Sequence, residues 1–263
     1  MTDAPRTPWS ADFPAVVTHT TLAERDRHPL YAKAKAGDVQ AALGLVADLL
    51  LPDAIDCLRV ILGNRCPIVA AVAAIETSGF NAIPDAMAQV IGSRLGLPLD
   101  TGELRQINTV AHTRASGWHR IVTPPVFAGS VTAGEDYLLI DDHVGLGGTL
   151  ANLRGYIESI GGRVVAMSTL TQSRDAATIA LTHPTLSMLK SKHGHELENY
   201  WQANFGHGLD CLTEVEGAYV ARQPTLDAIA RRLVEAAKKA GGNHLSAIAV
   251  EGLTRPPLKG QLP

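Results

Sequence analysis

The sequence predicts an α/β protein built on a parallel sheet, with helices on both faces. A continuous apolar run at 67–75 is typical of a strand that is buried on both faces. A second apolar run at 137–140 is followed by a glycine-rich stretch, a helical pattern and a third apolar run at 164–170. Strands that alternate with helices of this length are joined by right-handed crossovers in a parallel sheet.

Length and charge limit the classes of protein that this chain can belong to. It has 263 residues, of which 46% are hydrophobic, and its 23 basic and 26 acidic side chains give a net charge of -3. Such a balance argues against a nucleic-acid partner, because phosphate neutralisation requires a basic excess. Without a repeat or a break in composition we expect one domain over 1–263, with these parts: an N-terminal helical segment (about 29–62), a core (about 63–171), a C-terminal hood with helices (about 172–245) and a flexible tail (255–263).

Membrane and export signals are absent from the sequence pattern. The amino-terminal residues lack the basic start and apolar run of a secretory signal. The most apolar stretch, Ala41–Leu51, is far shorter than the roughly 20 residues of a membrane span. Cys57, Cys66 and Cys211 form no closely spaced pair, so we expect buried thiols and a cytoplasmic protein without a membrane partner.

The sequence pattern of the N-terminal part predicts two helices after a segment of irregular backbone. Residues 1–35 show no sustained period and predict extended or irregular backbone. Asp38 is a good N-cap for a helix at Val39–Leu51, where apolar residues recur at steps of three and four. A second helix follows at Asp53–Leu62, and Gly63 ends it.

The core predicts two strand, loop and helix units. In the first, the loop 76–81 leads into a helix at Pro84–Leu95, with Gly96 beyond its end. The second unit consists of a strand at 137–140, a loop at 141–148 and a helix at 149–160. A further strand follows at 164–170. Both loops would lie at the carboxyl edge of the sheet, where ligands bind in open parallel sheets.

The remaining segments are less regular. Arg105–Gly134 is polar and too long for a simple turn, so we expect a functional loop there. Helices are predicted near Leu186–His193 and at Thr225–Ala240. Between them, Tyr200, Trp201 and Phe205 could stack on a nucleobase, although packing of the C-terminal helices is the favoured interpretation.

The stretch that follows the second strand carries the chemistry. Asp141 and Asp142 are adjacent carboxylates, which suit a polyhydroxyl sugar or a metal-bound ligand better than stability alone. Gly145, Gly147 and Gly148 would let backbone N–H groups approach a ligand closely. With the positive end of the following helix, these amides would form a phosphate cradle without lysine or arginine.

This stretch resembles a known signature. Ile140-Asp-Asp-His-Val-Gly-Leu-Gly-Gly-Thr-Leu150 after an apolar strand is similar to the phosphoribosyl pyrophosphate (PRPP) signature of the type I phosphoribosyltransferases, and it looks like a less-studied bacterial branch. The strand, loop and helix of 68–97 are similar to the family's pyrophosphate-binding unit. The resemblance therefore implies the type I phosphoribosyltransferase fold.

The resemblance also implies roles for single residues. Asp141 and Asp142 would bind the ribose hydroxyls, and a loop within Arg105–Gly129 would close over the reacting centre, with Arg114 and Arg120 as its cations. The 5-phosphate would be held by these residues: Val144, Gly145, Leu146, Gly147, Gly148 and Thr149, of which Thr149 is also expected to cap the helix. The loop that contacts pyrophosphate would contain Glu76, Thr77, Ser78 and Gly79.

By the same resemblance the protein would be a Mg2+-dependent transferase and would form a homodimer. A nitrogenous acceptor, such as a nucleobase or a related heterocycle, would displace pyrophosphate from PRPP. Mg2+ would be coordinated by oxygens of PRPP and by water, without a direct protein ligand. Asp141 or Asp142 would be the nearest protein group and would contact the ion through water.

Two departures from the family pattern keep an alternative open. Positions 145 and 146 usually carry hydroxyl or acidic side chains, whereas this chain has Gly145 and Leu146. The pyrophosphate loop also lacks a basic residue that many relatives carry. A PRPP- or nucleotide-sensing regulator with little or no activity is therefore the second hypothesis, and hydrolysis of a ribosyl bond is the third.

Histidines supply the remaining candidates. His193, His195 and His207 could suggest a metal site, but a solvated loop is the favoured interpretation. His143 lies beside the acids, where a raised pKa is expected if it faces them.

Overall fold

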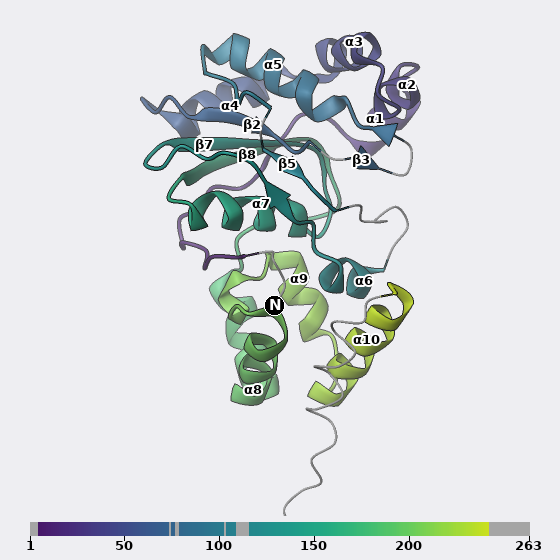
Figure 1. The fold of residues 1–263 in the computed structure, drawn as a ribbon, viewed down its shortest axis with the longest axis vertical. Coiled ribbons are helices and arrows are strands. Elements are labelled where there is room, and N and C mark those ends of the chain that lie inside the picture. The colour runs from purple at the N-terminus through teal and green to yellow at the C-terminus, as the bar shows by residue number, and fades with distance from the viewer. Residues whose placement is uncertain (1–4, 74, 77–78, 103, 109–115, 242–263) are drawn as a thin grey trace, which may run out of the picture.

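The chain forms a four-stranded sheet in which every strand is parallel to its neighbours. The computed structural model describes residues 5–73, 75–76, 79–102, 104–108 and 116–241. Within them the order is β1-β8-β7-β2 (Figure 1). These strands span Val17–Thr18 (β1), Arg163–Gln172 (β8), Asp136–Val144 (β7) and Ile68–Ala71 (β2). The α/β class with a parallel sheet is thus confirmed.

All three predicted strands differ in length from the prediction, and β2 and β7 differ most. β2 ends at Ala71, and the apolar run beyond it turns into a short antiparallel hairpin of β3 (Ile75–Glu76) and β4 (Gly79–Phe80). β7 extends past its predicted end at 140, because the backbone of Asp141 pairs with Thr169 and that of His143 with Thr171. A backbone ladder can continue through polar side chains at the edge of a sheet, so the change from apolar to acidic residues did not end the strand.

The N-terminal helices cover one face of the sheet (Figure 1). Asp38 accepts a hydrogen bond from the N–H of Ala41 and caps α3, as predicted. The helices are α1 (Leu22–Arg27), α2 (Tyr31–Lys35), α3 (Val39–Leu49), α4 (Pro52–Leu62) and α5 (Ile83–Leu95). The prediction of irregular backbone over residues 1–35 is wrong for α1 and α2. α1 begins with a capping box between Thr21 and Glu24, a signal that the sequence carries.

α7 (Gly148–Ser159) covers the opposite face, so helices lie on both sides of the sheet. Leu150 and Leu153 of α7 pack against Leu139 and Met167 of the two central strands, and all four are buried. The buried neighbours Leu138 and Ile140 belong to the core under the N-terminal helices. Alternate residues of β7 therefore serve opposite faces.

A third core lies in a helical unit beyond α7 (Figure 1). The unit contains α6 (Gly117–Val122), α8 (His183–Phe205), α9 (Glu214–Ala221) and α10 (Leu226–Lys239), with a 3-10 turn at Leu209–Cys211. Trp201 and Phe205 are buried in it with ring centroids 4.4 Å apart, and Tyr200 packs against the same core. Tyr200, Trp201 and Phe205 therefore pack within the helical unit, as the favoured interpretation predicted.

The segment predicted as one long loop has structure of its own. Besides α6, it contains β5 (Arg105–Gln106) paired antiparallel with β6 (Phe127–Ala128). α8 is also longer than the predicted 186–193, and it bends at Gly194, where φ is +64°. The predicted tail at 255–263 lies outside the described residues.

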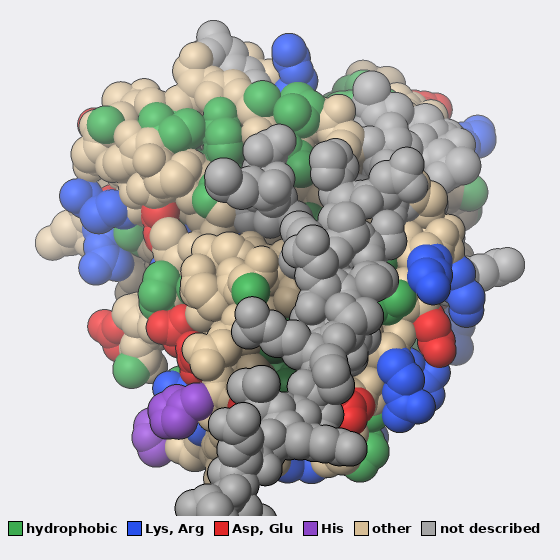
Figure 2. Space-filling view, turned by 60° about the horizontal axis from the view of Figure 1, so that its bottom comes forward, with side chains coloured by type: hydrophobic (Ala, Val, Ile, Leu, Met, Phe, Trp, Pro, Cys, Tyr) green, Lys and Arg blue, Asp and Glu red, His purple; other side chains and the backbone are tan. Residues whose placement is uncertain are grey.

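The surface adds two findings. Cys57 and Cys66 are exposed and only Cys211 is buried, so the prediction of three buried thiols is wrong for two of them. No helix in the described part of the chain is long and apolar enough to cross a membrane. On the face in Figure 2, Lys and Arg side chains are interspersed with Asp and Glu among the residues drawn in colour.

Candidate functional site

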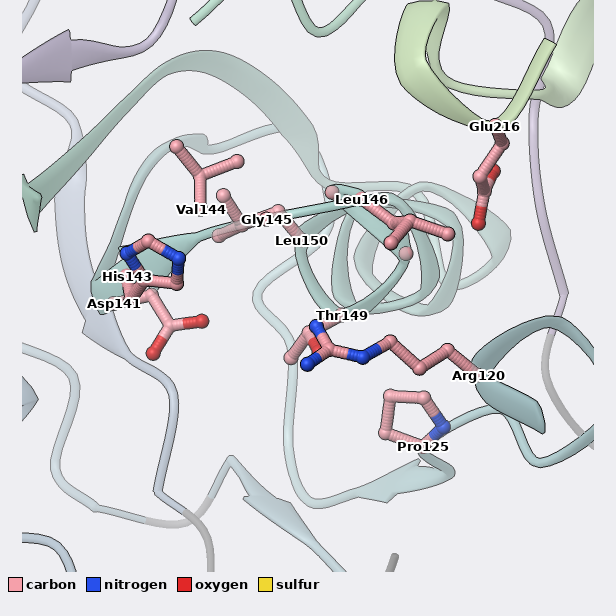
Figure 3. Close-up of a pocket in the computed structure, with 12 residues that line it drawn as sticks. Arg120, Pro125, Asp141, His143, Val144, Gly145, Leu146, Thr149, Leu150 and Glu216 are labelled. Carbon is pink, nitrogen blue, oxygen red and sulfur yellow. The ribbon is translucent and has the colours of Figure 1, made fainter. Parts of the chain in front are cut away.

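A cleft opens at the carboxyl edge of the sheet, where β7 gives way to α7 (Figure 3). It is a small cleft with a cavity volume of about 50 Å³, and it faces the helical unit on one side. Its lining consists of Arg120, Pro125, Asp141, His143, Val144, Gly145, Leu146, Gly147, Gly148, Thr149, Leu150 and Glu216. The structure therefore places the predicted phosphate loop, one of the two acids and one predicted cation in a single cleft.

The turn into α7 depends on Gly147. This residue is the N-cap of the helix, with φ at +83°, and a Cβ there would lie 3.0 Å from the Thr213 methyl group. Thr149 is the second residue of the helix, so the prediction that it caps α7 is wrong. Because no side chain caps α7, its first N–H groups remain available for an anion at the positive end of the helix.

Arg120 reaches the phosphate loop from α6 of the helical unit. An ideal Cβ on Gly145 would lie 3.1 Å from Arg120 Nη1, so the absent side chain makes room for the guanidinium. Figure 3 shows the Arg120 side chain extending from α6 into the same cleft that Thr149 lines. Burial lowers the pKa of Arg120, but a guanidinium stays charged at neutral pH. Arg120 thus lies on a helix, against the phosphate loop, and not on an unstructured segment.

Leu146 connects the loop with the helical unit. Its side chain packs against the core of that unit, and its carbonyl oxygen accepts a hydrogen bond from the Thr213 hydroxyl. The loop is therefore held from outside the sheet as well as by its own turn.

Glu216 lies behind the loop and is neutralised by Arg6. Arg6 donates to both carboxylate oxygens of Glu216, at 2.6 and 3.0 Å, and its Nε donates to Asn152 Oδ1 at 2.7 Å. A Cβ on Gly148 would lie 2.9 Å from Glu216 Oε1, so the ion pair contacts the first turn of α7. Sequence reasoning missed both residues, although Thr213 and Glu216 have the spacing of a capping box, which α9 indeed forms.

The two acids point to opposite faces of β7. Asp141 lines the cleft, and one of its carboxylate oxygens accepts a hydrogen bond from the N–H of Asp142 at 2.8 Å. Burial, and next the nearby charge of Asp142, raises the pKa of Asp141 well above its usual range. The carboxyl in the cleft therefore keeps its proton to a higher pH than an exposed aspartate does, and in that form it can both donate to and accept from a hydroxyl.

Asp142 is ionised and paired on the other face. Lys35 Nζ of α2 donates to its Oδ2 at 2.8 Å, and Asn81 adds a side-chain hydrogen bond. Burial by itself would raise the pKa of Asp142, but the Lys35 ammonium outweighs it and keeps this pKa below the usual value. No sequence signal pointed to Lys35, which is 107 residues away along the chain.

His143 is neutral and held within the sheet layer. Thr171 Oγ1 donates to the Asp142 carbonyl, so it accepts from His143 Nδ1 at 2.9 Å. Nε2 then accepts from the Ser173 hydroxyl at 3.1 Å. Burial lowers the pKa of His143, so the expectation of a raised pKa is wrong.

Three predicted site residues, Thr77, Ser78 and Arg114, lie outside the described residues. Glu76 and Gly79 pair across the β3–β4 hairpin, next to the sheet edge that carries the acids. Within the described part of the chain, no group of three or more His, Cys, Asp or Glu side chains could hold a metal ion. The histidines at 193, 195 and 207 thus form no such group there.

Comparisons with known proteins give relatives but no family. No protein-family model matches the chain. Protein TraN of Escherichia coli is 38% identical over 258 residues, which cover 97% of this chain and 57% of that protein. An uncharacterized protein of Haemophilus influenzae is 40% identical over 152 residues, or 58% of this chain and 34% of that protein. The chain thus spans about half or less of the length of these relatives.

Solved structures with some likeness include two phosphoribosyltransferases. Adenine phosphoribosyltransferase from Thermoanaerobacter pseudethanolicus is 19% identical, with a TM-score of 0.33, over 51% of this chain and 70% of that one. Orotate phosphoribosyltransferase from Aeropyrum pernix is 21% identical, with a TM-score of 0.32, over 54% and 68%. Scores this low show no more than the parallel sheet itself shows.

Proposed function

We propose that this protein binds PRPP in the cleft and transfers its phosphoribosyl group to a nitrogenous acceptor, with release of pyrophosphate. The observation that carries the proposal is the phosphate cradle at 144–149. Uncapped helix amides, a glycine N-cap and the Arg120 guanidinium converge on the same cleft as a buried acid, at the carboxyl edge of a parallel sheet. The sequence motif at 140–150 fits the same ligand.

The proposed roles follow from the contacts in the cleft. The amides of the loop and Arg120 would bind the 5-phosphate, which assigns Arg120 to that end of the ligand instead of the pyrophosphate end. Protonated Asp141 would exchange hydrogen bonds with a ribose hydroxyl. The acceptor nitrogen would attack C1 as the bond from C1 to pyrophosphate breaks, and the fixed sugar would keep the two reacting atoms aligned.

Mg2+ would arrive with PRPP and would neutralise charge on the leaving pyrophosphate. The donor set fits this arrangement, because the described residues offer no cage of three ligands and Asp142 is occupied by Lys35. Asp141 is the carboxyl that could contact a water of the ion.

Calorimetric titration with Mg2+-PRPP tests the proposed function. We expect binding by the wild-type protein, and at least about 10-fold weaker binding by Asp141→Ala combined with Arg120→Gln, because two ligand hydrogen bonds, one of them charge-assisted, are lost. Exposed Arg59 at the far side of α4 offers a charge-matched control, and Arg59→Gln should bind like the wild type. The absence of PRPP binding by the wild type would refute the proposal.

A regulator that senses PRPP or a nucleotide is the second candidate function. The observation that favours it is the contact of Leu146 and Thr213, which joins the phosphate loop to the helical unit. Ligand binding at the loop could change the position of the helical unit relative to the sheet. Release of pyrophosphate from PRPP with any base of a panel would exclude a purely sensory role, whereas tight binding without release would support it.

A further inference from the structure

Lys35 provides a partly buried positive charge next to Asp142, from a helix that the sequence motif does not include. Its ammonium lies 2.8 Å from Asp142 Oδ2, and the Lys35 side chain keeps 25% of its surface exposed. The Asp142 side chain is 10% exposed. The cation therefore retains a path to solvent, whereas the anion has almost none.

The end of α2 that carries Lys35 packs directly against the β3–β4 hairpin. The N–H of Ala82 donates to the Ala34 carbonyl at 3.2 Å, just after the hairpin. Gly37 comes so close to the hairpin that a Cβ there would lie 3.0 Å from the Phe80 carbonyl oxygen. Asn81, the residue directly after the hairpin, and Lys35 both bind the Asp142 side chain. The Asp142 carboxylate therefore lies between Lys35 and the end of the hairpin.

The hairpin has no cation of its own. Residues 75–81 contain no lysine, arginine or histidine. A pyrophosphate held at this edge of the sheet would therefore need a positive charge from another segment, and Lys35 is the lysine that the fold brings to the acid pair beside the hairpin.

A purely structural role explains this arrangement less well. A buried ion pair often stabilises a fold no more than apolar residues of the same size, so docking of α2 does not by itself require one. A lysine has a long flexible stem and three donors, which lets it move between a carboxylate and a phosphate oxygen.

We propose that Lys35 is a pyrophosphate-binding residue, which Asp142 holds in place while no ligand is bound and which contacts the pyrophosphate of PRPP when the ligand is bound. This inference rests on the proposed function and extends it. The pyrophosphate group of the ligand would lie between the end of α2 and the β3–β4 hairpin, and its 5-phosphate at the loop 144–149.

Two separate probes test the role of Lys35. The wild type, Lys35→Met and Lys35→Arg are titrated with Mg2+-pyrophosphate and, separately, with ribose 5-phosphate. Lys35→Met should bind pyrophosphate about 10-fold more weakly or worse, the loss of one charge-assisted hydrogen bond, and Lys35→Arg should restore most of the affinity. Ribose 5-phosphate affinity should stay within about 2-fold. Exposed Lys33 on the same helix is the matched control, and Lys33→Met should behave like the wild type.

The outcomes separate the inference from the proposed function. Unchanged pyrophosphate affinity in Lys35→Met, while ribose 5-phosphate still binds to the wild type, would overturn the role of Lys35 alone. If neither probe binds to the wild type, the proposed function itself fails.

A double variant excludes an indirect effect. Lys35→Met leaves Asp142 buried without its partner, and that charge could itself repel pyrophosphate or unfold α2. Lys35→Met combined with Asp142→Asn removes both charges. Pyrophosphate binding as weak as in the single variant would support direct contact, and recovery to the wild-type affinity would contradict it.

Discussion

Two regions at the carboxyl edge of the sheet, the phosphate-loop end and the acid end, are built in different ways. The phosphate-loop end consists of consecutive residues, 144–149, supported from behind by the neutral Arg6–Glu216 pair. The acid end combines Asp141 and Asp142 on β7 with Lys35 on α2 and Asn81 after the hairpin. The first end relies on backbone amides and one guanidinium, and the second relies on side chains with opposite charges. A ligand that spans both must therefore satisfy two independent kinds of recognition.

The largest expected effect concerns the support of the loop end. Arg6→Leu leaves Glu216, whose side chain is 2% exposed, without its counter-ion. We expect the free energy of unfolding to fall by about 3–5 kcal/mol, the usual effect of removing one partner of a buried pair. Urea denaturation followed by circular dichroism measures it. A double variant, Arg6→Leu with Glu216→Gln, should recover part of the loss, and equal losses in both would contradict the account.

Arg120 is the next test, because it is the one charged side chain that we assign to the phosphate. Arg120→Gln should weaken ribose 5-phosphate binding by about 10-fold or more through loss of a charge-assisted contact. Calorimetry with ribose 5-phosphate measures the change. Arg120→Lys should retain part of the affinity. If pyrophosphate binding falls and ribose 5-phosphate binding does not, Arg120 serves the acid end instead of the phosphate-loop end.

Gly147 shapes the backbone of the phosphate loop, and Gly134, which lies outside the loop, is its matched control. Their φ angles are +83° and +85°, but a Cβ would contact Thr213 at Gly147 and nothing within 4 Å at Gly134. Alanine at either position should cost about 1–2 kcal/mol of unfolding free energy, because L-residues resist positive φ. Only Gly147→Ala should also weaken ribose 5-phosphate binding. Equal ligand affinities for the two variants would show that the turn does not shape the site.

The pH dependence of stability distinguishes the two acids at the other end. The raised pKa of Asp141 means that the folded chain keeps a proton that the unfolded chain has released. Stability should therefore fall as pH rises from the usual aspartate range through this raised pKa. Asp142 acts in the opposite sense, since its lowered pKa contributes stability above the usual range that is lost as pH falls through the folded-state value.

Substitutions reveal these opposite signs. Asp141→Asn should be more stable than the wild type at neutral pH, with the advantage vanishing in acid, because Asn can still accept the Asp142 N–H. Asp142→Asn should be less stable at neutral pH, because Lys35 loses its partner. Urea denaturation at a series of pH values measures both, and effects of the same sign at neutral pH would contradict the assigned protonation states.

The contrast between the two ends also explains what could be predicted from the sequence. The glycine loop and the helix after it are contiguous, so their residues predicted the turn, although the cap falls on Gly147 and not on Thr149. The Asp38 cap of α3 was predictable for the same reason. Contacts between distant segments, such as Lys35 with Asp142, depend on how the N-terminal helices pack on the sheet. No local pattern encodes that packing.

A similar limit applies to the faces and the charge states. Adjacent acids in a loop could share one ligand, but the extension of β7 through Val144 turns Asp141 and Asp142 to opposite faces. The length of that strand depends on its pairing with β8, which sequence alone does not show. Likewise, burial beside Thr171 and Ser173 lowers the pKa of His143 and outweighs the charge of Asp142, which by itself would raise it.

Phosphorus NMR of Mg2+-PRPP with added protein tests the central claim most directly, because the 5-phosphate and both pyrophosphate phosphorus atoms give separate signals. We predict that all three signals shift or broaden with the wild type, and that Gly147→Ala reduces the change of the 5-phosphate signal most. A spectrum that the wild-type protein leaves unchanged, or one in which the 5-phosphate signal alone is unaffected, would contradict the claim that the loop 144–149 is the phosphate site of a PRPP-binding cleft.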